Sequence, residues 1–72
     1  MKTQNSALFY EIRIKGHLGQ NTLIWFEDFT TEYSGDGETI LRGPIVDQSA
    51  LHAVLERIFE LGLELTLIKK MR

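Results

Sequence analysis

Cysteine is absent from this 72-residue sequence, so disulfide bonds are excluded, and only two histidines, His17 and His52, offer nitrogen ligands to a transition metal. These histidines lie far apart and outside any ligand-spaced motif, so no metal site and no cofactor are expected. A chain of this length builds one small core, which without a disulfide or a metal supplies only about 3–5 kcal/mol of stability. Association with another copy is the remaining means of stabilisation, and the sequence therefore predicts a homo-oligomer, most simply a homodimer.

Long apolar runs are absent as well. No stretch approaches the roughly 18 apolar residues of a membrane span, and the amino-terminal MKTQNSALFY lacks the continuous apolar region of a signal peptide. The net charge of -2 and the isoelectric point near 5.6 provide no general attraction to nucleic acid or to anionic membranes, and the basic end 69–72 is interpreted as a solvated terminus. The sequence thus predicts a cytoplasmic protein with neither a membrane nor a nucleic-acid partner.

The apolar content is high enough for one folded unit. Hydrophobic residues make up 43% of the chain, so we expect a single α+β domain spanning residues 1–72, of which 1–7 form a flexible amino-terminal segment. From Leu8 to Leu18, apolar residues occupy most even positions and polar residues most odd positions. This period of two predicts a strand with one buried face.

The middle of the chain predicts a short helix followed by a hairpin. Residues 22–28, TLIWFED, fit either a strand or a short helix, and the helix is favoured. Residues 29–33 alternate like a strand, and 34–37, SGDG, supply the glycines that a hairpin turn needs. Residues 38–43 then form the return strand, with Leu41 facing inward.

The stretch GPIVDQSALHAVL, from Gly43 to Leu55, contains residue types found in reactive sites, but most of it is explained as the start of a helix. Pro44 has no N–H for a sheet ladder, so the preceding strand should lose its pairing there. Asp47 is a natural N-cap, because its carboxylate accepts the free N–H groups of the first helical turn. An apolar arc of about 180° continues along the helix to Gly62, which is typical of the left-handed residue after a helix end.

The last strand follows directly, and its pattern places Leu63, Leu65 and Leu67 on the core side. The element order is strand, short helix, strand, strand, helix, strand, which matches the ferredoxin-like split βαβ pattern with a stunted first helix. We expect the first and third strands to lie side by side at the centre of the sheet and to run parallel, with the main helix covering one face. If 22–28 is a strand, the alternative is an antiparallel meander backed by one helix.

Two surfaces are candidates for function. The outward sheet face should carry apolar side chains that form a subunit interface, namely Phe9, Ile40 and Ile68. The alternative interface is the edge of the main helix with Ala50 and Phe59, and the sheet face is preferred. If the first and third strands run parallel, their carboxyl ends and the start of the main helix meet on one rim. That rim is predicted to bind an unknown small molecule through His17, Gln20, Asn21, Asp47, Gln48, Ser49 and His52.

Four segments resemble a group of small uncharacterised bacterial proteins: YEIRIKGHL (10–18), WF (25–26), DGETILRGPIVDQSALH (36–52) and LGLEL (61–65). The resemblance covers nearly the whole chain from Tyr10. It implies a free-standing cytosolic bacterial protein and brings no activity, ligand or catalytic residue with it.

These observations favour a non-enzymatic, small oligomeric module that binds a protein or a small ligand. The alternative is a small hydrolase-like enzyme that uses His17, Ser49 and His52, since Ser49 and His52 are helix neighbours within reach of each other. No third orienting group or oxyanion hole is apparent, so no enzyme activity is expected. RNA recognition on such a fold requires aromatic residues on the central strands, and the third strand, ETILRG, has none.

Overall fold

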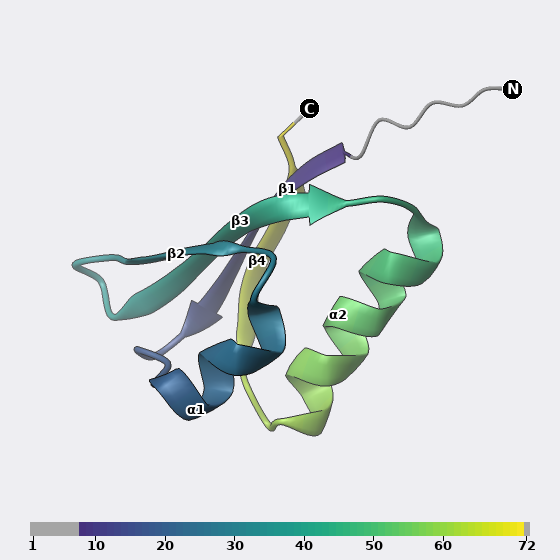
Figure 1. Cartoon of the computed structure of the whole chain (residues 1–72). Coiled ribbons are helices and arrows are strands. Elements are labelled where there is room, and N and C mark those ends of the chain that lie inside the picture. The colour runs from purple at the N-terminus through teal and green to yellow at the C-terminus, as the bar shows by residue number, and fades with distance from the viewer. Residues whose placement is uncertain (1–7, 72) are drawn as a thin grey trace, which may run out of the picture.

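The computed structural model describes residues 8–71 and shows one four-stranded antiparallel sheet with two helical segments on the same face (Figure 1). The predicted flexible segment 1–7 lies outside the described residues. The α+β class predicted from the sequence is confirmed. In chain order the elements are β1 (Leu8–Lys15), α1 (Gln20–Leu23), the 3₁₀ turn η1 (Ile24–Phe26), β2 (Thr30–Tyr33), β3 (Glu38–Ile45), α2 (Gln48–Glu60) and β4 (Leu65–Lys70).

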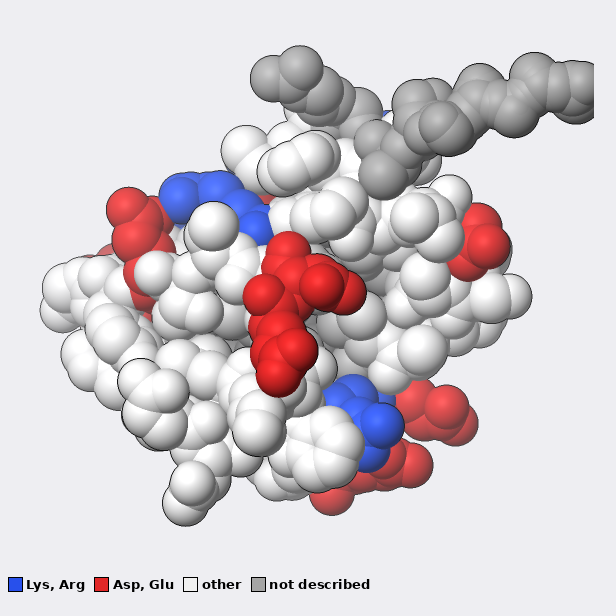
Figure 2. All heavy atoms as spheres, viewed as in Figure 1, with Lys and Arg blue, Asp and Glu red and all other residues white. Residues whose placement is uncertain are grey.

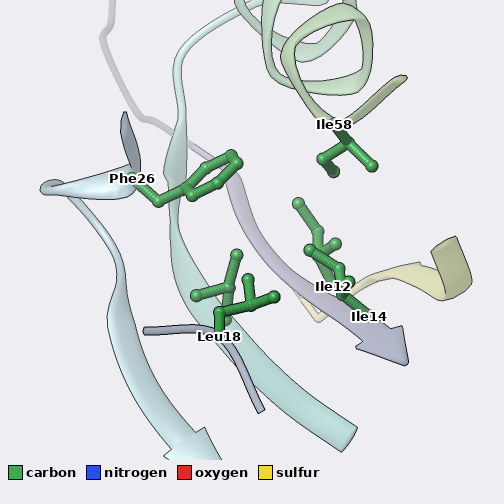
Figure 3. Close-up of a cluster of buried hydrophobic side chains, with 6 residues drawn as sticks. Ile12, Ile14, Leu18, Phe26 and Ile58 are labelled. Atoms are coloured by element: carbon green, nitrogen blue, oxygen red, sulfur yellow. The ribbon is translucent and has the colours of Figure 1, made fainter. Parts of the chain in front are cut away.

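The hydrophobic core lies between the sheet and the helical segments. The even positions of β1 face this core as predicted, and Ile12 and Ile14 are completely buried. They pack with Leu18, Phe26 and Ile58, which come from the loop after β1, from η1 and from α2 (Figure 3). Full burial of an aliphatic side chain contributes about 1.5–3 kcal/mol, so this small cluster is the main source of stability.

The segment after β1 is helical rather than extended, as favoured from the sequence. α1 continues directly into η1, which buries Phe26. Phe29 then packs against the backbone of Gly43 in β3, where an added Cβ would lie 2.8 Å from the Phe29 ring and 2.9 Å from the carbonyl oxygen of Asp28. This close approach requires a glycine at position 43 and brings the helical segment over the β2–β3 half of the sheet.

The predicted hairpin turn is confirmed at 34–37. The Ser34 N–H donates to the Glu38 carbonyl at 2.9 Å, and the Ser34 hydroxyl accepts from the N–H groups of Asp36 and Glu38. Gly37 has a φ of +84°, a conformation that L side chains rarely adopt. The local sequence therefore determines this turn.

The predicted end of the third strand is wrong, because β3 continues past Pro44 to Ile45. β2 pairs with β3 only as far as Arg42, whereas β1 pairs with β3 through Ile45. Position 44 therefore lies beyond the β2 ladder, at an edge-like site where a proline without an N–H is tolerated.

Both predicted ends of α2 are confirmed. The Asp47 carboxylate accepts the Ala50 N–H at 2.8 Å, which makes it the N-cap. Gly62 has a φ of +73°, and the N–H of Leu63 donates to the Ile58 carbonyl at 3.0 Å, as in a Schellman ending. This tight turn passes the chain directly from α2 into β4.

The predicted parallel arrangement of the central strands is wrong. The sheet order is β2-β3-β1-β4, and β1 and β3 are antiparallel neighbours that pair from Leu8↔Ile45 to Lys15↔Glu38. The helical segment after β1 returns the chain, and the β2–β3 hairpin reverses it once more, so β3 runs opposite to β1. The carboxyl end of β1 therefore lies beside the amino end of β3.

β4 departs from its predicted alternation. Its register with β1 shifts between Arg13 and Ile14, which pair with Leu67 and Leu65, so Thr66 is an extra residue in a bulge. Beyond the bulge every side chain changes face. Ile68 consequently packs against the core, and Leu67 turns to the outer face with 39% exposure, opposite to the prediction for both.

Candidate functional site

The residues predicted to form one polar rim lie at opposite ends of the sheet. His17, Gln20 and Asn21 follow the carboxyl end of β1, whereas the group 47–52 follows the carboxyl end of β3. The two ends of an eight-residue strand are roughly 23 Å apart at 3.3 Å per residue. The predicted rim therefore does not form, because its parallel central strands do not exist.

At the first end, His17 belongs to a loop that is held by other side chains. Its Nε2 lies 3.3 Å from the Ser34 carbonyl oxygen, and its ring lies 4.9 Å from the ring of Tyr33. The Tyr33 hydroxyl donates to the Leu18 carbonyl at 2.7 Å. His17 is thus an exposed side chain that packs against the β2–β3 hairpin.

The buried Thr39 hydroxyl fixes the same loop from inside. It donates to the Gly16 carbonyl at 2.7 Å and accepts the Leu18 N–H at 2.9 Å, while the residue is fully buried. Gln20 and Asn21 begin α1 and are exposed. This end of the sheet is consequently explained by loop structure alone.

At the second end, Asp47, Gln48, Ser49 and His52 are all exposed around the start of α2. The Asp47 carboxylate is occupied as the helix cap. No hydrogen bond joins Ser49 to His52 among the described residues. In residues 8–71, moreover, no three histidine or carboxylate side chains gather closely enough to hold a metal ion.

A shallow groove lies on one flank of α2, lined by His52, Leu55, Glu56 and Phe59. Its volume is about 310 Å³, and Phe59 is 63% exposed beside it. Of the predicted rim, only His52 contributes to this groove. The remaining lining residues, Leu55, Glu56 and Phe59, repeat at helical spacing along α2.

The position of this groove follows from the opposite flank of α2. There the Arg57 guanidinium stacks on the Trp25 ring of η1 at 4.2 Å, a cation–π contact. Phe59 projects about 200° around the helix from Arg57, so the groove faces away from η1. The flank of α2 that carries the groove is therefore the one opposite η1.

The outer sheet face carries an ion network around a buried carboxylate, whose burial the sequence pattern did not predict. Glu11 is only 4% exposed and accepts from Arg13 Nε at 2.8 Å and from Arg42 Nε at 3.0 Å. Arg42 also donates to Glu32 at 2.6 Å, and Arg13 lies 3.8 Å from Glu38. The hydrogen bonds from Arg13 and then Arg42 lower the pKa of the Glu11 carboxyl, so this group stays ionised.

A signal for this network was present in the sequence. Glu11 and Arg13 occupy outward positions of one strand, and Arg42 occupies an outward position of its neighbour. Cross-strand pairing of Glu11 with Arg42 follows once the register is known. The register, however, depends on how the strands assemble.

The predicted interface residues are also separated by the structure. Phe9 is 45% exposed on the outer sheet face. Ile40 faces the same side but is 7% exposed, and Ile68 faces the core because of the β4 bulge. The outer sheet face therefore offers much less apolar surface than the pattern predicts.

On the face that Figure 2 shows, acidic and basic side chains form small separate groups within a mainly uncharged surface. Within residues 8–71, no helix has both the length and the apolarity to cross a membrane. The architecture defines a small α+β domain with a shallow, partly apolar groove on one flank of α2.

The family model described as "Domain of unknown function (DUF8691)" matches residues 9–69, and the chain belongs to this family. Comparisons with curated proteins and with solved structures found no match to this chain. The match begins within β1 and ends within β4, so it covers every described helix and strand in whole or in part.

Proposed function

We propose that this chain is a non-enzymatic interaction module that works as a homo-oligomer, with a dimer as the simplest form. The observation that supports the proposal is that apolar side chains at the end of α2 remain exposed to solvent. Ile58 is the one buried residue among the described residues of this helix, whereas Phe59 is 63% and Leu61 is 36% exposed. Val54 and Leu55 of the apolar arc pack against the core, whereas Phe59 at the edge of the arc stays exposed and is suited to contact another subunit.

The size of the core supports the same conclusion. Its buried hydrophobic cluster is small, and the chain has no disulfide to add stability. A chain of this length gains from covering its exposed apolar side chains in an assembly. The cytoplasm is the proposed compartment, in keeping with the absence of cysteine.

The groove on α2 favours a protein partner over a small ligand. Its lining comes from a single helix, whereas small-molecule sites are concave and bury 70–90% or more of a drug-sized ligand. A shallow apolar groove beside an exposed phenylalanine is more suited to receive a side chain from a partner surface. The hydrolase alternative has less support, because His17 is far from Ser49 and His52.

We further propose that the fold is ferredoxin-like. The support is the element order β-α-β-β-α-β together with a fully antiparallel sheet in the order β2-β3-β1-β4. The first helix is reduced to α1 and η1, and Phe26 and Phe29 supply the apolar cover that a longer helix would provide.

The test is the molar mass in solution, measured by light scattering across a dilution series. We expect more than one subunit at micromolar concentration. Phe59→Asp should shift the mass towards the monomer, whereas the matched control Val46→Asp should not, since Val46 is 69% exposed on the β3–α2 link away from the groove. A monomer at every concentration contradicts the proposal, and dissociation by Phe9→Glu alone would move the contact to the outer sheet face.

A further inference from the structure

β4 is an edge strand of the sheet. Among the described residues, no strand pairs with the edge of β4 that faces away from β1. The Met71 N–H donates to the Phe9 carbonyl at 2.7 Å, so by alternation the backbone groups of Lys69 and Leu67 also face β1. The backbone N–H and C=O groups of Ile68 therefore point to the free edge. Such an edge is a template for the addition of another strand.

Charges are distributed unevenly along this edge. Glu60 and Glu64 are exposed just before β4, and Lys69 and Lys70 are exposed at its other end. An antiparallel neighbour with the same sequence would set the basic end of one copy beside the acidic start of the other. A parallel neighbour would instead set like charges together, which is unfavourable. The edge is therefore complementary to itself in one orientation.

We propose that β4 pairs antiparallel with β4 of a second copy of this chain, joining the two sheets across a twofold axis. This inference rests on the proposed function, because it names the partner and the geometry of the contact. The acidic start and the basic end of β4 are consistent with a twofold axis, since an isologous contact requires a surface that complements itself.

The charges also select a register. If Leu67 lies on the twofold axis, the bulged residue Thr66 stays outside the new ladder, and Lys69 of each copy lies beside Glu64 of the other; both of these side chains project from the outer sheet face. Leu67 then meets Leu67 of the second copy in a non-hydrogen-bonded pair, in which opposite Cα atoms are about 4.5 Å apart. Leu67 is 39% exposed in the single chain, and this contact covers it.

The groove lies on the flank of α2 that faces away from η1, and β4 packs through Ile68 against the core cluster that contains Ile58 of α2. Strand pairing brings the groove-bearing flanks of two α2 helices together, and Phe59 of each copy meets the flank of the other. The contact thus combines backbone pairing with apolar cover for Phe59, which is 63% exposed in the single chain.

The competing interpretation of β4 is that it is a protected edge. A bulge and lysine side chains are common means by which edge strands avoid pairing with other chains, and β4 has both. The bulge lies at Thr66 towards the start of the strand, however, and the lysines lie at its end with glutamates at the start. This distribution opposes parallel pairing and leaves the antiparallel arrangement available.

The first experiment uses the absence of native cysteine. Leu67→Cys introduces a single thiol, and the pair across the axis falls within the Cα separation that a disulfide spans. Mild oxidation at micromolar concentration should convert most of the protein to a covalent dimer. The control Thr31→Cys places a thiol on the other edge strand, β2, and should cross-link slowly. Equal or faster cross-linking through Thr31→Cys would overturn the proposal.

The second experiment tests the register by charge reversal. Lys69→Glu and Glu64→Lys should each weaken dimerisation by about tenfold, since every substitution affects two symmetric pairs. The double variant restores opposite charges across the axis and should recover the affinity of the original chain. Additive weakening in the double variant would overturn the proposed register and contact.

Together the outcomes separate this inference from the proposed function. A protein that is monomeric at every concentration contradicts both. A protein that remains a dimer, but neither cross-links through Leu67→Cys nor recovers affinity in the double variant, retains the proposed function and overturns pairing through β4.

Discussion

Glu11 provides the most informative test of the structure, because its burial is visible only in the folded chain. The Glu11→Gln substitution keeps the size and shape of the side chain and removes its charge. Glu11 accepts one charge-assisted hydrogen bond from Arg13 and one from Arg42, at 2.8 and 3.0 Å. Arg13 and Arg42 donate to different carboxylate oxygens, and in glutamine one of these oxygens is replaced by an NH2 donor, so either Arg13 or Arg42 loses its hydrogen bond to residue 11.

The expected loss follows from these two bonds. Hydrogen bonds to charged groups contribute about 1.5–3 kcal/mol each, but the side chains of Arg13 and Arg42 are 35% and 36% exposed and regain water when they are released. We halve the summed contribution of the two hydrogen bonds to allow for this solvation. Glu11→Gln is therefore expected to lower the free energy of unfolding by about 1.5–3 kcal/mol.

Equilibrium unfolding in urea at pH 7 measures this difference, with Glu32→Gln as the matched control. Glu32 pairs with the same Arg42, but its side chain is 63% exposed. Its substitution should cost less than about 1 kcal/mol, as for exposed ion pairs in general. Equal losses from the two variants would refute the reasoning that burial makes Glu11 important.

The same residue predicts how stability depends on pH. Because its arginine partners lower the pKa of Glu11 in the folded chain, its contribution is fully present above the unfolded value of about 4.3. That contribution is lost as the pH falls through the lower folded pKa. The original chain should therefore lose stability below about pH 4.3 more steeply than Glu11→Gln, and parallel acid-unfolding curves would contradict this.

Other positions offer independent tests by thermal or urea unfolding. Thr39→Val removes a buried hydroxyl with two hydrogen bonds and should lower the free energy of unfolding by about 2 kcal/mol. The control Thr31→Val on the exposed edge strand should lower it little, and similar losses from the two variants would contradict the role of Thr39. Gly43→Ala should cost about 1–3 kcal/mol through overlap with the ring packed on it, and Gly35→Ala, which has open space, serves as its control. Asp47→Ala should cost about 1 kcal/mol and Asp47→Asn far less, because both Asp and Asn cap a helix; equal losses would indicate a role for the charge.

The predicted functional surfaces depended on the directions of the strands and on their register, which the local sequence pattern does not contain. The polar rim required parallel central strands, and the antiparallel register placed His17 and Ser49 at opposite ends of the sheet. The sheet-face interface required strict alternation in β4, and one extra residue at Thr66 moved Ile68 to the core. In the first case one strand direction was wrong, and in the second case one strand face was wrong. Each of these errors changed the position of every residue in the predicted surface.

The sequence by itself determined the features whose partners lie within a few residues. The buried face of β1, the 34–37 turn, the Asp47 cap and the Gly62 helix end are of this kind, because each depends on hydrogen bonds or burial patterns between near neighbours. Only the tertiary structure decided the strand directions, the β4 bulge, the burial of Glu11 between two arginines, the exposed flank of α2 and the free edge of β4. These depend on contacts between segments far apart in the chain, whose relative direction and register no short stretch of sequence contains.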